Sequence, residues 1–206
     1  MSQQIATIRI ENWSQVFELQ ALKETTLFRG QGSDWPLKTS LERQLEASEI
    51  RPEHYLHKEY ALIREFRRRA HLYLSDLPEE ADLVGWLALM QHHGAPTRLL
   101  DFTYSFFVAC YFAFIDKHDN PVVWAISDLW LRECLVPNKL RYDLLEGMIH
   151  TANKKLTHVL QQFRGGGTPD GEFEMLLMIE PTRQIQRLAV QQGLFLMPLN
   201  LHSGFV

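Results

Sequence analysis

The feature that most constrains the fold is the segment 104–115, with the sequence YSFFVACYFAFI. As a helix it would be apolar around its whole circumference, yet it is far shorter than the roughly 20 residues needed to cross a membrane. It therefore predicts a buried helix at the centre of a folded domain. Ser105, Ala109 and Ala113 recur every four residues along it. Such a stripe of small side chains lets another backbone approach closely, so the residues just before the helix should be rigidly anchored.

A polar stretch precedes this helix. The residues 81–94 predict a helix that ends at Gly94, because glycine favours the conformation that terminates helices and Pro96 follows. A short strand is then expected over 97–100, on which Thr97 and Asp101 share one face. Asp101 or Thr103 is expected to cap the apolar helix.

The rest of the chain alternates between helical and strand patterns. Helices are expected over 13–23, 40–47, 53–74 and 182–190, and strands over 5–10, 25–30, 121–127, 172–181 and 191–199. With 206 residues and 46% hydrophobic content, one core is expected. We predict a single α+β domain over 1–206: a small mixed or antiparallel sheet surrounded by several helices, with the buried apolar helix at its centre.

Composition argues against several classes of protein. A net charge of −4 gives no global attraction to nucleic acid or to an anionic membrane. Two cysteines and no signal-peptide pattern favour a cytoplasmic protein without a disulfide framework. The chain has no phosphate loop, dinucleotide fingerprint, HExxH or GxSxG pattern. His54 and His57 could share a helical face, but a third ligand is missing, so no metal site is predicted.

Arg29 is the first candidate site residue, because it follows a short apolar strand segment. A planar guanidinium at a strand end can bind phosphate or carboxylate through two parallel hydrogen bonds. The alternative is a structural ion pair with Asp101, since an unpaired buried charge is strongly disfavoured. Gln31 is a neighbouring candidate for ligand binding.

His92 and His93 end the predicted helix 81–94. Adjacent helical residues point about 100° apart, so we expect one of them to face a shared site. His93 is favoured as a hydrogen-bond donor or general base, with helix capping as the alternative.

Two other groups of charged residues are each consistent with two interpretations, a functional site or an ordinary solvent-exposed face. Glu172 and Glu174 share a strand face, which suits paired carboxylates and also an ordinary solvent face. The residues Arg64, Arg67, Arg68 and His71 share a helical face. A solvated face is the usual meaning of such a cluster, and contact with a phosphate backbone is the alternative.

Two segments carry a resemblance to a known family. LFRGQGSDWPLKTSLERQ followed by LALMQHHGAPTRLLDFTYSFFVACYFAF resembles the FRG-domain family, which is named for an aromatic-Arg-Gly tripeptide. IEPTRQIQRLAVQQGLF is similar to that family's closing pattern. The resemblance covers about 27–195, implies a role for Gln191 or Gln192, of which we choose Gln192 as a ligand-binding residue, and suggests a prokaryotic origin.

A fainter resemblance is to mono-ADP-ribosyltransferases of the Arg-Ser-Glu type. Phe28-Arg29-Gly30 is similar to their first element, and Glu172-Phe173-Glu174 to their third. The resemblance implies that Arg29 binds the phosphate of NAD, and that Glu174 holds a ribose hydroxyl. Thr97 or Thr103 would take the place of the serine of the middle element.

We therefore expect a nucleotide-binding domain that is ADP-ribosyltransferase-like or cleaves NAD as its substrate. Arg29 would hold phosphate, Thr97, Asp101 and His93 would complete the pocket, and Glu174 would stabilise the transition state. One alternative is a non-catalytic module that binds a nucleotide, a nucleic-acid end or a protein partner, as in a prokaryotic defence or toxin system. Another is a polar network that serves the fold alone.

Overall fold

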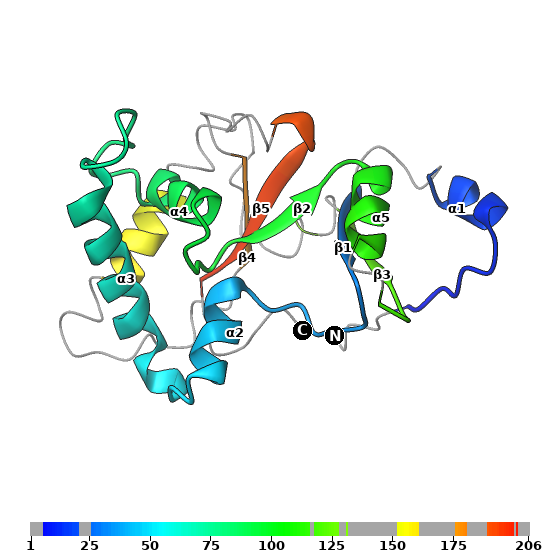
Figure 1. Ribbon diagram of the computed structural model, residues 1–206, viewed down its shortest axis with the longest axis horizontal. Coiled ribbons are helices and arrows are strands. Elements are labelled where there is room, and N and C mark those ends of the chain that lie inside the picture. The colour runs from blue at the N-terminus through cyan, green and yellow to red at the C-terminus, as the bar shows by residue number, and fades with distance from the viewer. Residues whose placement is uncertain are drawn as a thin grey trace.

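The protein folds around a five-stranded antiparallel sheet with helices at both ends, as the computed structural model shows (Figure 1). The structure describes residues 6–20, 26–115, 118–127, 131, 152–160, 176–180, 189–199 and 201. In spatial order the strands are β3 (Val122–Ser127), β1 (Thr26–Gln31), β2 (Leu100–Thr103), β5 (Gly193–Pro198) and β4 (Leu176–Ile179). The predicted α+β class is confirmed, and the sheet is antiparallel throughout.

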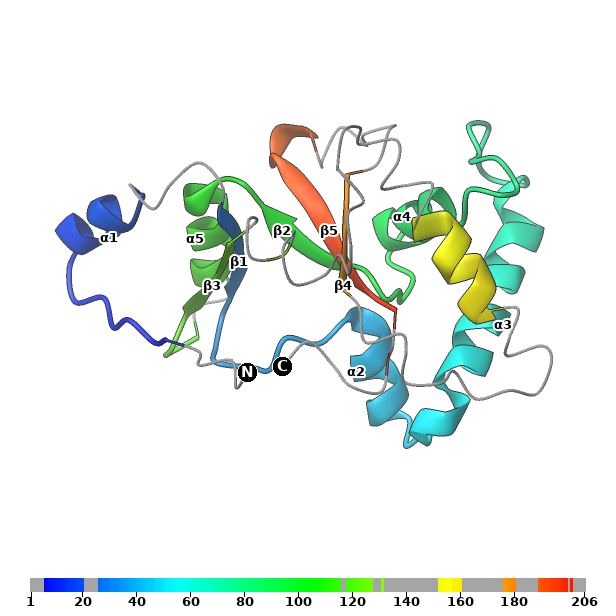
Figure 2. The same ribbon diagram turned by 180° about the vertical axis from the view of Figure 1, so that it is seen from behind.

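The helices gather at the two ends of the sheet. They are α1 (Trp13–Gln20), α2 (Ser40–Ala47), the 3-10 turn η1 (Pro52–His54), α3 (Tyr55–Ala70), α4 (Leu83–His92) and α5 (Phe106–Phe114). A further helical segment, 152–160, packs between α3 and α4, as both ribbon views show (Figure 2). None of the helices among the described residues is long and apolar enough to cross a membrane.

Both faces of β5 are buried, because neighbouring residues along this strand contribute to different clusters. On β5, Leu194 and Leu196 pack with Phe102 of β2, whereas Phe195 and Met197 pack with α3, α4 and the segment 152–160. This alternation follows from the two-residue period of a strand. This part of the sheet is therefore covered on both sides, and β2 is the central strand of the five.

Helix α5 lies directly against β1, which the small residues make possible. Ala109 and Ala113 are buried, and a Cβ atom at Gly30 would overlap the carbonyl oxygen of Ala109 and lie 2.6 Å from the backbone nitrogen of Ala113. The expected close approach of a backbone to this stripe is confirmed. Gly30 itself continues the strand instead of turning it, so its role is to admit the helix.

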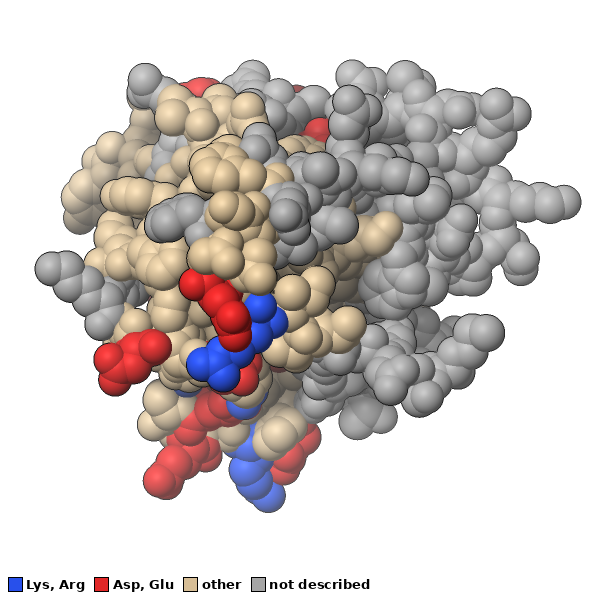
Figure 3. Space-filling model, turned by 90° about the vertical axis from the view of Figure 1, so that its right-hand side faces the viewer, with Lys and Arg blue, Asp and Glu red and all other residues tan. Residues whose placement is uncertain are grey.

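The opposite face of α5 is exposed, contrary to the prediction of burial on all sides. Phe107 is 44% exposed and Tyr111 is 61% exposed, although the ring of Phe17 on α1 contacts the ring of Phe107. The side of the molecule that carries α1 shows mostly uncharged described surface, with charged side chains gathered below (Figure 3). The sequence showed that the helix is apolar around its whole circumference. It did not show which of its faces other elements would cover.

Several local predictions need correction. The described part of the expected first strand, 6–10, is not a strand and leaves Ile8 exposed, because it pairs with no strand of the sheet. The expected strand over 97–100 lies three residues later, as β2, where its residues find partners on β5. Because Asp101 and Thr103 belong to β2, Ser105 caps α5 instead, accepting a hydrogen bond from the backbone of Val108.

A buried ion pair joins the helices to the end of β5. Arg98 is 0% exposed, and its Nε and Nη2 atoms bind the two carboxylate oxygens of Glu59 on α3. Its Nη1 atom donates to the carbonyl oxygens of Pro198 and Leu199, at 3.0 and 2.9 Å. Every side of the guanidinium is used, so Arg98 holds the segment before β2 in one position.

Candidate functional site

A polar pocket of about 230 Å³ opens where α2, the end of α4 and β2 meet. The guanidinium of Arg29 on β1 and the carboxylate of Asp101 on β2 both line it, so these two groups converge as expected. The other polar residues of its lining are Ser40, Arg43, Gln91, His92 and Gln191. We call this cavity the Arg29 pocket.

Arg29 is fixed in the gap between β1 and β2. These strands share the single pair Phe28 and Thr103, and beyond it the Nη1 atom of Arg29 donates to the backbone carbonyl of Asp101 at 2.8 Å. The Nε atom donates to Gln31 Oε1 at 3.3 Å. The side chain therefore bridges two strands that have begun to separate, and its position is set by backbone geometry.

The alternative role for Arg29, an ion pair with the Asp101 carboxylate, is absent from the described structure. Among the described residues no carboxylate oxygen lies within 4.0 Å of the Arg29 guanidinium. Burial lowers the pKa of Arg29, the negative charge of Asp101 opposes that shift, and the positive charge of Arg43 adds to it. Arginine nevertheless stays protonated in proteins, so the pocket keeps a half-buried cation.

Arg43 adds a second cation to the same pocket. It projects from α2, donates from Nη1 to the carbonyl of Lys38 at 2.6 Å, and has no carboxylate partner within the described part of the chain. Asp101 is the one carboxylate among the lining residues. The lining thus carries a net positive charge, in contrast to the chain as a whole.

A hydrogen-bonded relay supports the carboxylate from behind. Gln91 Nε2 donates to Asp101 Oδ2 at 3.0 Å, and Gln91 Oε1 accepts a bond from the hydroxyl of Thr97. Thr97 is fully buried and does not line the pocket. Its backbone exchanges hydrogen bonds with the Ser40 hydroxyl at the start of α2. Thr97 therefore positions other residues, and the structure gives it no surface for a ligand.

At two places the structure brings the neighbour of the expected residue to the pocket. His92 lines the pocket, whereas His93 is the C-terminal cap of α4 and its ring lies near Phe66. Gln191 also lines it, whereas Gln192 adopts a left-handed backbone with a φ of 47° and is exposed. In both pairs, the residue that lines the pocket is one position before the predicted one.

Two other candidates lie apart from the pocket wall. Gln31 is buried, donates to the carbonyl of Trp35 at 2.8 Å and orients Arg29 from behind. Glu172 and Glu174 lie outside the described residues, so their proposed roles stay predictions.

Sequence reasoning missed Arg43 and Gln91. Arg43 belongs to a short polar helix whose capping box, formed by Thr39 and Glu42, can be recognised in the sequence TSLE. The cap sets the first residue of α2, and therefore which helical positions face the same direction. Counting from that residue could have predicted that Arg43 faces β2. Gln91 lies within QHHG, next to the two histidines that were the predicted site residues of this segment.

Comparison with known protein families identifies the part of the chain that builds this pocket. Residues 24–121 match the family model of the FRG domain. This segment is an FRG domain. No curated protein and no solved structure matches the chain.

The FRG segment supplies most of the Arg29 pocket. Arg29, Arg43 and Asp101 all lie within it, and so does the Thr97 relay. Gln191 and Phe195, which also line the pocket, come from beyond the matched range. The pocket is therefore completed by β5 and the turn before it.

Proposed function

We propose that the Arg29 pocket binds the phosphate of a nucleotide. The observation that carries the proposal is that two guanidinium groups, Arg29 and Arg43, face one cavity and neither has a carboxylate within 4.0 Å among the described residues. Arg29 is half-buried without a direct ion pair, and Asp101 alone does not balance the charges of Arg29 and Arg43. The net positive charge favours an anionic ligand, and arginine fits the oxygen pairs of phosphate.

The size of the cavity limits which part of a nucleotide it can hold. Pockets that enclose a whole drug-sized ligand measure about 300–1,000 Å³. A volume of about 230 Å³ suits a diphosphate or a sugar phosphate. The base would then lie outside, and we expect little discrimination between adenine and guanine nucleotides.

NAD is our candidate for the nucleotide. The support is the similarity of Phe28-Arg29-Gly30 to the first element of Arg-Ser-Glu type ADP-ribosyltransferases, together with the placement of Arg29 on the pocket wall. In NAD cleavage, water attacks C1′ of the nicotinamide ribose and forms a C1′–O bond as the C1′–N bond breaks. Nicotinamide leaves with the bonding electron pair, and the attacking water releases a proton. Arg29 would hold the diphosphate and Glu174 would stabilise the developing positive charge on the ribose.

Binding is tested by isothermal titration of the protein with ADP, NAD and adenosine. We expect ADP and NAD to bind and adenosine, which lacks phosphate, to fail. Arg43→Ala should weaken ADP binding by about tenfold or more, because a charge-assisted hydrogen bond contributes about 1.5–3 kcal/mol. Arg51→Ala removes the same charge from the exposed pair with Glu53, outside the pocket, and is the matched control.

Catalysis is tested separately, by following nicotinamide release from NAD. Loss of release in both Arg43→Ala and Glu174→Gln would support cleavage in this pocket. Nucleotide binding without release would leave a non-catalytic binding module, whereas failure of every phosphate-bearing compound to bind would refute the proposal. Equal weakening by Arg43→Ala and Arg51→Ala would also refute it, because it would indicate a diffuse charge effect.

A further inference from the structure

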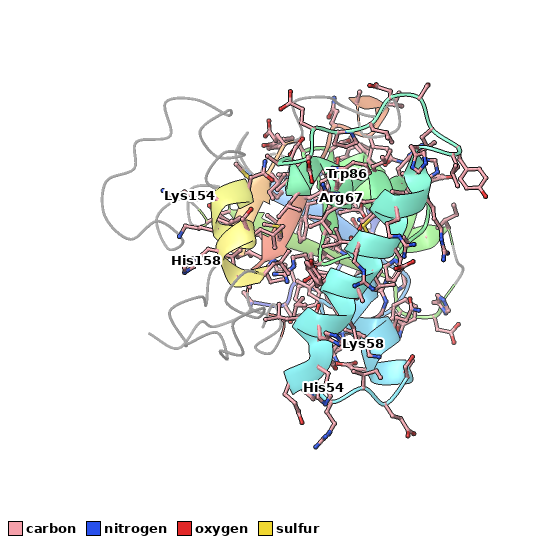
Figure 4. All side chains as sticks on the ribbon, turned by 90° about the vertical axis from the view of Figure 1, so that its left-hand side faces the viewer. His54, Lys58, Arg67, Trp86, Lys154 and His158 are labelled. Atoms are coloured by element: carbon pink, nitrogen blue, oxygen red, sulfur yellow. The ribbon has the colours of Figure 1, made fainter. Side chains whose placement is uncertain are left out.

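A second cavity lies on the other side of α4 from the Arg29 pocket and shares no lining residue with it. It measures about 610 Å³ and lies between α3, the start of α4 and the helical segment 152–160. Figure 4 views the molecule from this side, with Arg67 of α3 and Trp86 of α4 labelled side by side. We call it the α3–α4 groove. Its volume falls within the range of about 300–1,000 Å³ that encloses a small organic ligand.

The floor of the groove is apolar. Ile63 from α3, Trp86 from α4 and Leu160 from the segment 152–160 line it and belong to the buried part of the protein. Leu83 adds a partly buried wall at the start of α4. These side chains offer contact area and no hydrogen-bonding groups apart from the indole of Trp86, whose Nε1 atom already donates to the carbonyl of Glu79 at 3.0 Å. The floor therefore suits an apolar body.

One wall carries a cation in a fixed position. The guanidinium of Arg67 lies over the ring of Trp86, 5.1 Å from its centroid, and donates to the backbone carbonyl of Glu80 at 3.1 Å. Within the described part of the chain, the ion-pair partner of Arg67 is the carboxylate of Glu80 at 3.6 Å, and the Glu80 side chain is 96% exposed. Such an exposed pair contributes little, so an anionic ligand can replace it without leaving a buried charge behind.

The rim has more positive than negative charge. Arg64 and Arg68 also line the groove, and both pair with Glu65, as does Arg69 on the same helix. One carboxylate therefore serves three guanidinium groups. With Glu80 the one carboxylate among the groove-lining residues, the rim has unbalanced cations that can meet the head group of a ligand.

From this arrangement we infer that the α3–α4 groove binds a small amphipathic organic anion, with an aromatic or branched apolar body on the floor and a carboxylate, sulfonate or phosphate beside Arg67 and Arg68. A neutral apolar molecule would leave the cations unused. A purely ionic polymer would leave the apolar floor exposed to water, so the groove suits a small molecule better than a nucleic-acid backbone.

The test uses 1-anilinonaphthalene-8-sulfonate, whose fluorescence rises in an apolar site, and N-phenyl-1-naphthylamine, which has the same rings without the sulfonate. We expect the sulfonate to bind at least about fivefold more tightly than the neutral compound, because the groove supplies the counter-charge. Thr157→Trp, which places a large side chain at the groove wall, should abolish binding. Thr157 is only partly buried, so this change should leave the fold intact.

A matched pair of variants isolates the charge effect. Arg68 and Arg69 are similarly exposed, at 69% and 72%, and both pair with Glu65, but only Arg68 lines the groove. Arg68→Gln should raise the dissociation constant of the sulfonate about fivefold, and Arg69→Gln less than about twofold.

Three outcomes would overturn the inference. Equal effects of Arg68→Gln and Arg69→Gln on the dissociation constant would indicate that the dye responds to the overall positive charge of α3 and not to the groove. Loss of binding in Tyr111→Ser and not in Thr157→Trp would place the dye on the exposed face of α5. A single-stranded oligonucleotide that competes with the dye, and that Arg68→Gln and Arg69→Gln weaken equally, would make the basic face of α3 a nucleic-acid surface.

Discussion

The buried ion pair between Arg98 and Glu59 gives the sharpest test of the fold. Glu59→Leu removes the carboxylate and leaves the guanidinium of Arg98 buried with one side unmatched. Breaking a buried pair from one side costs about 3–5 kcal/mol. Domains of this size are stable by about 5–15 kcal/mol, so the variant should fold with reduced stability.

Arg98→Met should be more damaging, because Arg98 does more than pair with Glu59. It leaves the Glu59 carboxylate buried without its cation, and it also removes the donor to the carbonyls of Pro198 and Leu199. Each buried carbonyl that loses its donor adds roughly 1–3 kcal/mol. We expect a total of about 5–11 kcal/mol, which would leave much of the protein unfolded at 25 °C.

The double variant Glu59→Leu with Arg98→Met should be more stable than Arg98→Met alone. It buries no unpaired charge, and the loss is restricted to the two carbonyl contacts at about 2–6 kcal/mol. Urea denaturation followed by circular dichroism measures the free energy of unfolding of all four proteins. The reasoning is refuted if adding Glu59→Leu fails to raise the stability of Arg98→Met, or if the two single variants lose the same free energy of unfolding.

The remaining predictions concern two glycines and a cysteine. Gly30→Ala should lower the free energy of unfolding by at least about 3 kcal/mol, because the new methyl group overlaps the backbone of α5. Gly94→Ala meets no atom within 4 Å but forces alanine to a φ of 77°, so we expect about 1–2 kcal/mol from the same denaturation curves. Cys110 should resist iodoacetamide in the folded protein at pH 8, since burial raises the pKa of its thiol; rapid labelling in peptide mass maps would contradict its packing against β1.

Much of the fold follows from local patterns in the sequence. The strands β1, β3 and β5 lie where apolar runs predicted them, and Gly94 ends α4 with the left-handed backbone expected of a helix-terminating glycine. These features depend on neighbours within a few residues, and such neighbours are visible in the sequence.

The misplaced features depend on partners that are far away along the chain. Thr97 and Arg98 read as strand residues, but bonds to Ser40 and Glu59 hold them outside the sheet. The convergence of Arg29 with Asp101 could be expected, whereas the choice of His92 over His93 depends on the phase of α4. A phase error of one residue reverses which side chain faces a cavity, and periodicity alone does not resolve it.

The position of β2 has a consequence for how the FRG segment can be handled. The matched range ends at 121, yet β2 pairs on one side with β5, and Arg98 binds carbonyls at 198 and 199. A fragment cut at 121 would therefore present a bare strand edge and leave Nη1 of Arg98 without its two carbonyl acceptors, which favours aggregation over autonomous folding. During synthesis, β2 and Arg98 therefore lack these partners until about eighty residues beyond 121 have left the ribosome. Until then the exposed strand edge can aggregate.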